Sequence, residues 1–250
     1  MGDIHGTFKA LRQCLQQCNF DYDADCLIQL GDITDGYDEV DRCVDELLTI
    51  KNLIAIRGNH DAWFNDFIQT GEHSGHWDQG GKATALSYLR RAGREPVVRE
   101  SGEGLQVNLL PEDVPAAHRN FFAQQRIYYL DDRDNCYVHA GFNRHLPFAG
   151  QPDYLYYWDR TLWNDAVAYQ GFRNKNRKTL PFQVLMPFNH IFIGHTPTLH
   201  WKTDVPMHAA HIINLDTGAG HNGKLTIMDL ETLKYWQSDP VKTLYETAYR

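Results

Sequence analysis

Residue types that bind metals occur in five short motifs of this chain. The first, Gly2-Asp3-Ile4-His5-Gly6, places a carboxylate and an imidazole with one residue between them. The other four are GDITDG at 31–36, RGNHD at 57–61, VHAG at 138–141 and GHTP at 194–197. Carboxylate oxygens, imidazole nitrogens and one amide oxygen together suit a borderline divalent metal such as manganese, iron or zinc. The motifs therefore predict a metal site, and a carboxylate shared by two ions would make it dinuclear.

Each motif taken alone has a simpler interpretation. A Gly-Asp pair after a strand is usually a turn, and a lone histidine is usually a surface or core residue. Nine other histidines lie in no comparable motif, and we assign them no chemistry: His73, His76, His118, His145, His190, His200, His208, His211 and His221. Chance does not easily place five motifs with ligand residues at successive strand ends, so the set favours chemistry.

Short apolar runs precede most of the motifs and predict the strands that position them. These runs are CLIQL at 26–30, LIAI at 53–56, CYVHAGF at 136–142 and HIFIGHT at 190–196. Runs of this length and composition are typical of buried strands in a parallel sheet. Because ligands of open α/β sheets bind at the carboxyl ends of the strands, we expect the motifs to meet at one edge.

The remaining pattern predicts helices between the strands and a different end to the chain. Phe8, Leu11, Leu15 and Cys18 recur at helical spacing, and residues 83–92 and 112–124 also read as helices. Three strands are predicted at 211–218, 224–230 and 234–237, with a tight hairpin at Asn222-Gly223. We therefore expect an α/β fold with a second, more antiparallel sheet, formed as a single domain over residues 1–250.

Composition excludes several classes of protein. No stretch of the 250 residues approaches the roughly 18 to 20 apolar residues that a membrane span needs, and no export signal is apparent. The five cysteines are odd in number and lack CxxC spacing, which favours a reducing cytoplasm. The net charge of −8 disfavours nucleic acid as a partner. We expect a cytoplasmic protein with no membrane and no nucleic-acid partner.

In combination the motifs resemble those of the calcineurin-like metallophosphoesterases. The resemblance runs from Gly2 to about Gly220, and within the superfamily it is to the phosphoprotein phosphatase branch, which includes small bacterial and phage serine/threonine phosphatases. Two features favour this branch: GHTP at 194–197 where other relatives have GHTH, and NLDTGAG at 214–220. The resemblance implies a two-sheet β-sandwich flanked by helices.

The resemblance also implies a ligand set for two divalent ions, with manganese the first choice and iron or zinc the alternatives. Carried onto matching positions, one ion is held by Asp3, His5 and Asp32, and the second by Asp32, Asn59, His139 and His195. Two such ions, about 3.5 to 4 Å apart, polarise a phosphoryl oxygen and activate a water. The implied activity is phosphomonoester hydrolysis, with a phosphorylated protein or a small phosphate ester as substrate.

Other residues receive catalytic and substrate-binding roles by the same resemblance. His60 corresponds to the proton donor to the leaving group, with Asp35 orienting its imidazole, and Asp61 to a brace for the loop. Arg57 and Arg160 correspond to phosphate-binding arginines, since a guanidinium fork suits anionic oxygens. Gly36 departs from the family pattern, because a third substrate-binding arginine would stand there. We expect Gly36→Arg to improve phosphate binding.

Two alternatives remain open at this point. The chain resembles enzymes that hydrolyse dinucleoside polyphosphates, such as diadenosine tetraphosphate, in almost all of its metal motifs. A non-catalytic phosphate-binding protein is also consistent with the loss of the arginine at position 36, although all the implied metal ligands are present.

The first motif raises a separate expectation about the first strand. A buried strand of about five apolar residues normally leads into such a loop, and only Met1 stands before Gly2. We therefore expect the first strand to be truncated. Either the reading frame begins upstream, or Asp3 and His5 are poorly anchored and the first metal site is weak.

Overall fold

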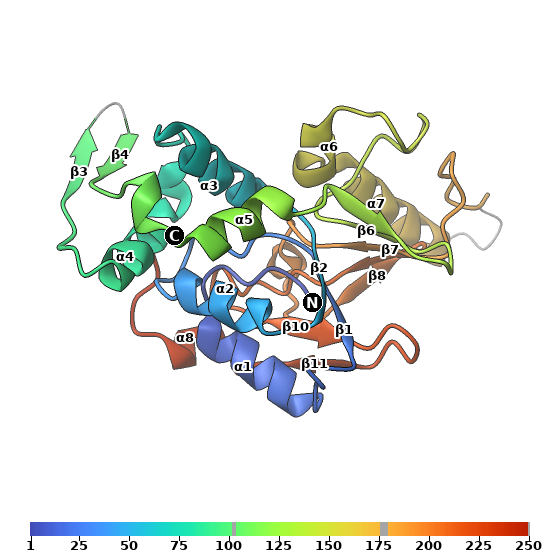
Figure 1. Cartoon of the computed structure of the whole chain (residues 1–250). Helices are drawn as coiled ribbons and strands as arrows, with labels where there is room; N and C mark the ends of the chain where they lie inside the picture. Colours follow the sequence, from blue (N-terminus) through green and yellow to red (C-terminus); the bar gives the residue numbers. More distant parts are fainter. Residues whose placement is uncertain (102–103, 176–179, 250) are drawn as a thin grey trace.

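The structure, a computed structural model, describes residues 1–101, 104–175 and 180–249 (Figure 1). Within these ranges the strands form one five-stranded sheet and three two-stranded sheets. The helices are α1 (Phe8–Gln17), α2 (Val40–Leu48), α3 (Asn59–Thr70), α4 (Gly81–Arg91), α5 (Ala116–Gln124), α6 (Asp153–Trp158), α7 (Thr161–Lys175) and α8 (Val241–Leu244). Short 3₁₀ turns lie at Trp77–Gln79, Pro111–Asp113 and Thr198–Trp201.

The strands that lead into the motifs pair in parallel, as the apolar runs predict. β1 (Cys26–Gln29) pairs with β2 (Asn52–Ala55) in parallel. The five-stranded sheet has the order β5-β6-β7-β9-β8, and its central pairs β6-β7 and β7-β9 are parallel. Its strands are β5 (Tyr128–Leu130), β6 (Cys136–Val138), β7 (Ile191–Ile193), β8 (Met207–Ala209) and β9 (Ile212–Asn214). The two remaining antiparallel pairs are β3 (Val98–Ser101) with β4 (Gly104–Val107), and β10 (Thr226–Met228) with β11 (Tyr235–Gln237).

Within the described residues, three hydrophobic clusters pack the helices against the sheets and the sheets against each other. The largest packs α1 to α5 against β1 and β10, and a second packs α6 and α7 against the five-stranded sheet. The third lies between the sheets and joins Leu30, Tyr137, Phe192 and Leu215. Figure 1 shows the corresponding groups of helices at the two sides of the molecule. A mixed α/β fold is therefore present, whereas the two-sheet sandwich and the single domain over 1–250 stay predictions.

The start of the chain is anchored by backbone hydrogen bonds on both sides. The amino group of Met1 donates to the carbonyl of Ile28 at 2.8 Å, and the Met1 carbonyl accepts from the amide of Leu30 at 3.0 Å. On the other side, the Gly2 amide donates to the carbonyl of Thr226 at 3.0 Å. Met1 thus lies between β1 and β10, near the label N in Figure 1. The truncated first strand stays a prediction, but Asp3 is attached to a fixed backbone.

Two sequence predictions about local structure were wrong in detail. The helix predicted at 112–124 is split, because Pro115 stands at the N-cap of α5 and a separate turn precedes it. The hairpin predicted at Asn222-Gly223 does not join two paired strands, since β9 pairs in parallel with β7 and β10 pairs with β11. The fully buried side chains of β9 place it inside the larger sheet rather than in a terminal hairpin.

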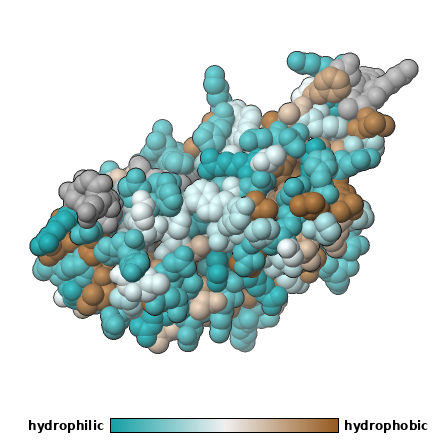
Figure 2. Space-filling model, turned by 90° about the horizontal axis from the view of Figure 1, so that it is seen from above, coloured by the Kyte–Doolittle hydropathy of each residue, from teal (hydrophilic) through white to brown (hydrophobic). Residues whose placement is uncertain are grey.

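No helix in the described ranges is long and apolar enough to cross a membrane. The face shown in Figure 2 is mostly hydrophilic, with separate hydrophobic patches. Among the described residues, large hydrophobic side chains with high exposure include Leu180, Leu185 and Phe172. The five cysteines, all within the described ranges, are free thiols.

Candidate metal centre

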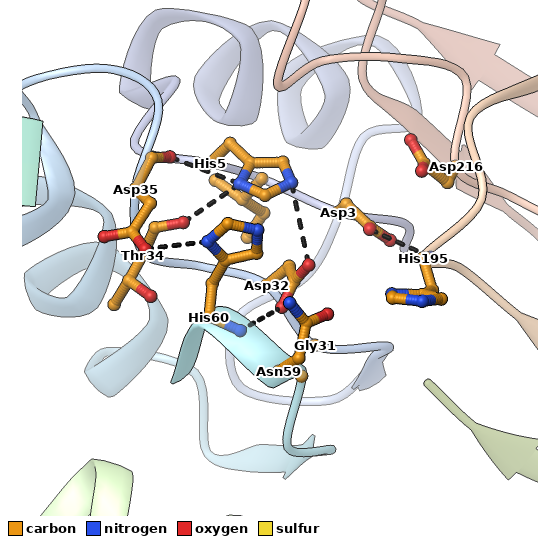
Figure 3. Close-up of polar contacts among 12 residues, drawn as sticks. Asp3, His5, Gly31, Asp32, Thr34, Asp35, Asn59, His60, His195 and Asp216 are labelled. Atoms are coloured by element: carbon orange, nitrogen blue, oxygen red, sulfur yellow. Dashed lines mark hydrogen bonds and ion pairs between the residues drawn. The ribbon is translucent and has the colours of Figure 1, made fainter. Parts of the chain in front are cut away.

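The predicted ligands lie just beyond the carboxyl ends of four strands, where parallel sheets place their binding sites. Asp32 follows β1, and Asn59 follows β2 as the first residue of α3. His139 directly follows β6, and His195 follows β7. Asp3 and His5 come from the anchored start of the chain, and all six side chains are buried. The fold therefore brings all six predicted metal ligands into one buried region, part of which Figure 3 shows.

The carboxylate of Asp32 is the centre of the arrangement. Its Oδ1 accepts the amide N–H of His60 at 3.0 Å, in the first turn of α3, where the helix end favours negative charge. Its Oδ2 lies 3.3 Å from Nε2 of His139 and 3.7 Å from Nε2 of His5. Figure 3 shows Asp32 beside His5, His60 and Asn59. Asp32 is thus positioned to be shared between two ions.

Backbone carbonyls hold two of the histidines in a ligand-competent orientation. Nδ1 of His139 lies 2.7 Å from the carbonyl of Leu30, and Nδ1 of His5 lies 2.9 Å from the carbonyl of Thr34. A carbonyl can only accept, so each Nδ1 carries the hydrogen. In the neutral form that binds a metal, each imidazole presents its lone pair at Nε2, the atom that faces Asp32 in both cases. This is the usual way in which outer contacts prepare a histidine for a metal.

The other ligands approach the same region. Oδ1 of Asn59 lies 3.3 Å from Nε2 of His139, so the amide oxygen and the imidazole converge. The amide N–H of His195 donates to Oδ2 of Asp3 at 3.0 Å, which links the first and last motifs. Oδ1 of Asp3 is buried and has no hydrogen-bond partner in the part of the chain that the structure describes. An unpartnered buried carboxylate oxygen is expected where a cation binds.

Strained backbone and close-packed glycines make this convergence possible. His5, Asp32, Asp35 and His195 all have left-handed backbone, with φ between 50° and 67°. Such conformations cost on the order of 1 to 3 kcal/mol each and cluster at functional sites. Gly58 and Gly194 leave room for the carboxylates, because an added Cβ would lie 2.0 Å from Oδ1 of Asp32 or of Asp3, respectively.

The electrostatics of the centre favour a cation. Burial, together with the carboxylate of Asp216, raises the pKa of Asp3 well above its usual range. Burial alone would also raise the pKa of Asp32, but the imidazoles of His139 and His60 outweigh it and hold that pKa well below its usual range. A divalent ion would offset both the burial of these carboxylates and their mutual repulsion.

Among the residues that the structure describes, two groups of side chains have ligand atoms close enough to hold an ion. One consists of Asp32, His139 and His195, and the other of His5, Asp32 and His60, each with its atoms within 4.8 Å of one another. Asp32 belongs to both groups. These donor atoms fit two divalent ions, since one carboxylate is shared and an oxygen of Asp3 has no partner among the described residues. The second group contains His60, whereas the resemblance implied Asp3 as the third ligand of that ion.

A buried histidine and carboxylate form a pair beside Asp32. Nδ1 of His60 lies 2.7 Å from Oδ2 of Asp35. The other oxygen of Asp35 accepts the hydroxyl of Thr84 at 2.6 Å, and that hydroxyl accepts the Asp35 amide at 2.8 Å. The carboxylate therefore fixes the orientation of the His60 ring. His60 and Asp35 lie as the proton-donor assignment requires, and this role stays a proposal.

The two predicted phosphate-binding arginines differ in position. Arg160 is exposed and its Nε donates to Nε2 of His195 at 3.1 Å, so its guanidinium lies at the centre. Arg57 is partly buried and donates to the carbonyls of Phe122 and Ala123 at 3.3 and 3.4 Å. Arg57 is thus engaged with the end of α5, and Arg160 is the better placed of the two.

Gly36, which stands where an arginine was expected, is confined by backbone. Its φ is +102°, a conformation that other residues rarely adopt. An added Cβ would lie 3.2 Å from both Cβ and the carbonyl oxygen of His5, and its amide donates to the carbonyl of Gly80 at 3.2 Å. The structure therefore argues against the expectation that an arginine would be accommodated at this position.

Sequence reasoning missed two residues that support the site. Thr84 lies on α4, and its hydroxyl bonds Asp35 from 49 positions away in the chain. Gln125 donates to Oδ2 of Asp61 at 2.8 Å, while Oδ1 of Asp61 accepts the amides of Ile33 and Thr34. Asp61 therefore braces the loop after β1, as predicted. No local pattern distinguishes Thr84 or Gln125 from any other polar residue.

Comparison with known proteins gives a consistent result. The chain matches the model of the calcineurin-like phosphoesterase family over residues 1–199. Serine/threonine-protein phosphatase 1 of Salmonella typhimurium is 25% identical over 232 residues, which span 92% of this chain and 90% of that protein. The structure of a putative diadenosine tetraphosphatase has a TM-score of 0.62 at 15% identity, covering 96% of this chain and 90% of that one. The structure of a cold-active protein-tyrosine phosphatase of a Shewanella species has a TM-score of 0.55 at 14% identity, covering 96% of this chain and 79% of that one. At these identities the two structures support the fold alone.

Substitution of the shared carboxylate tests the arrangement. We expect Asp32→Asn to weaken the binding of both ions by about tenfold or more, because the residue belongs to both ligand groups. Manganese titration calorimetry and elemental analysis of the dialysed protein would measure this. Asp23→Asn, at a side chain that is 76% exposed, is the matched control. A mutant that retains two tightly bound ions would show that Asp32 is no bridge.

The confined backbone at Gly36 generates a second prediction. We expect Gly36→Arg to lower the free energy of unfolding by roughly 1 to 3 kcal/mol and to weaken metal binding, because the strained side chain presses on His5. Urea denaturation and manganese titration measure the two effects. Gly75→Arg is the control, since nothing lies within 4 Å of an added Cβ there. Unchanged stability together with a lower KM would restore the expectation drawn from the sequence.

Proposed function

The chain belongs to the calcineurin-like phosphoesterase family, and on this premise we propose that it is a metal-dependent phosphomonoesterase of the phosphoprotein phosphatase branch. The similarity to a serine/threonine-protein phosphatase over 92% of the chain supports this branch. We propose proteins phosphorylated on serine or threonine as substrates. The observation that carries the proposal is the buried His60–Asp35 pair directly beside the shared carboxylate Asp32.

The proposed ligands divide between two ions. Asp3, His5 and Asp32 would hold the first, and Asp32, Asn59, His139 and His195 the second, with manganese as the proposed metal. When bound, such ions would polarise the phosphoryl group and activate a water for in-line attack. The chain's own contribution is to fix these ligands from four strand ends and from the anchored start of the chain, and to keep the Nδ1 hydrogens of His5 and His139 directed at backbone carbonyls.

His60 is the proposed general acid for the leaving group. Its Nδ1 faces Asp35, so the proton is delivered from Nε2, and the carboxylate keeps the ring oriented for this transfer. Thr84 donates to Asp35 and keeps that carboxylate oriented.

Arg160 is the proposed phosphate-binding residue. It is exposed beside His195, where its guanidinium can contact an anionic oxygen through charge-assisted hydrogen bonds. Arg57 stays a weaker candidate, because its guanidinium already donates to two carbonyls at the end of α5. With Gly36 contributing no side chain, Arg160 carries more of the phosphate recognition than its family counterpart would.

A second candidate function is hydrolysis of dinucleoside polyphosphates. It is supported by the fold similarity to a putative diadenosine tetraphosphatase, with a TM-score of 0.62. The net charge of −8 continues to argue against nucleic acid as a partner. A cytoplasmic location and the absence of a membrane partner stay proposals from the sequence.

A substrate panel separates the two candidates. We expect manganese-loaded protein to release phosphate from a phosphoserine peptide with a kcat/KM at least about tenfold higher than from diadenosine tetraphosphate. Asp32→Asn is the inactive control for contaminating phosphatases. The reverse order of the two substrates would favour the dinucleoside polyphosphatase. If the metal-loaded protein hydrolyses no phosphate ester, the remaining hypothesis is a non-catalytic phosphate-binding protein.

The acid role of His60 has its own signature. We expect His60→Asn to lower kcat for phosphoserine peptide by roughly 10² to 10⁴-fold, and for p-nitrophenyl phosphate by much less, because nitrophenolate needs little protonation. Metal content is measured in parallel, since His60 also lies in a candidate ligand group. His145→Asn, at an exposed histidine, is the control. Equal losses on both substrates, or loss of metal, would remove His60 from the acid role.

A further inference from the structure

Three rings form a continuous aromatic surface beside the metal centre, which we call the aromatic wall. Trp63 on α3 stacks on His76 with centroids 5.0 Å apart and planes 23° apart. Trp63 also contacts Trp158, the last residue of α6, at 5.5 Å. The three residues come from three separate segments of the chain, so only the tertiary fold assembles the wall.

The two tryptophans of the wall each contact a histidine of the proposed catalytic site. Trp63 meets the ring of His60 edge to face at 4.6 Å, and Trp158 meets the ring of His195 edge to face at 5.8 Å. His60 is the proposed donor to the leaving group, and His195 is the neighbour of Arg160. The wall therefore flanks the side on which a leaving group would lie.

The three hydrophobic clusters of the described residues do not include the two tryptophans, although Trp63 is buried. Phe64, next to Trp63, belongs to the first hydrophobic cluster, and Tyr156, two residues before Trp158, belongs to the second. Trp63 is 8% exposed, Trp158 is partly buried and His76 is exposed. Trp158 and His76 thus reach the surface, and large rings that pack on one another beside a site are typical of a binding surface.

We propose that Trp63 and Trp158 form a subsite for a planar aromatic group attached to the substrate phosphate, a proposal that rests on the proposed function. Indole faces bind flat rings through offset or edge-to-face contacts, which add to the burial of apolar area. The group recognised is a phenyl-type ring or a nucleobase, which share this chemistry. The two tryptophans thereby add esters that carry such a ring to the phosphoserine and phosphothreonine substrates proposed above, while the metals and His60 act on any of them.

Binding of non-hydrolysable ligands tests the subsite without relying on turnover. We expect manganese-loaded protein to bind phenylphosphonate about tenfold more tightly than methylphosphonate in titration calorimetry. Trp158→Leu should reduce that ratio to near one, and Trp158→Phe should restore most of it. Trp63→Leu provides a second route to the same result, with circular dichroism melting to verify folding.

A matched control and a second ligand pair complete the experiment. Trp236→Leu removes a partly buried indole from β11 and should leave the ratio at its wild-type value. Adenosine 5′-monophosphate and ribose 5-phosphate differ by the base alone, so a preference in this pair identifies a nucleobase as the ring. A ratio near one in both pairs, or a ratio that Trp158→Leu and Trp63→Leu leave unchanged, overturns the subsite. Phosphonate binding is independent of hydrolysis, so failure of the proposed activity in the substrate panel is a separate result.

Discussion

The arrangement of the site depends on one buried carboxylate. Oδ1 of Asp32 accepts the amide of His60 at 3.0 Å, and Oδ2 faces the imidazoles of His139 and His5. These contacts link the loop after β1, the start of α3, the end of β6 and the start of the chain. Burying a carboxylate is costly unless it is paired, and the imidazoles and the helix end compensate that cost here. The same geometry makes Asp32 the residue that two ions would share.

The side chains and backbone around Asp32 approach its carboxylate with the help of unusual backbone conformations. Asp32, Asp35 and His195 have left-handed backbone, and Gly58 approaches Asp32 so closely that any side chain would collide. This strain is maintained by the clusters that pack the helices and sheets around the loops. Gly36 is subject to a similar constraint, because its φ of +102° is a conformation that an arginine rarely adopts.

The ligands come from two separate parallel pairings, so the site exists only when these are packed together. β1 and β2 carry Asp32 and Asn59, while β6 and β7 carry His139 and His195. The cluster around Leu30 and the five-stranded sheet joins the two parts. Metal bound across this junction would stabilise the folded chain in proportion to its affinity, because the unfolded chain cannot assemble the ligand set.

The sequence by itself determined the parallel strands that precede Asp32 and His139, and the family, which the match over residues 1–199 confirms. It also predicted the candidate ligand residues after the apolar runs. These follow from local pattern, since strand propensity and residue type are properties of short segments. Tertiary structure alone decided the rest. It determined the hydrogen bond from Thr84 to Asp35 and the left-handed backbone of Gly36. It also determined the pairing of β9 with β7 in the larger sheet and the contacts of the aromatic wall. Each of these depends on contacts between distant parts of the chain, or on backbone angles that the whole fold imposes, and no short segment encodes them.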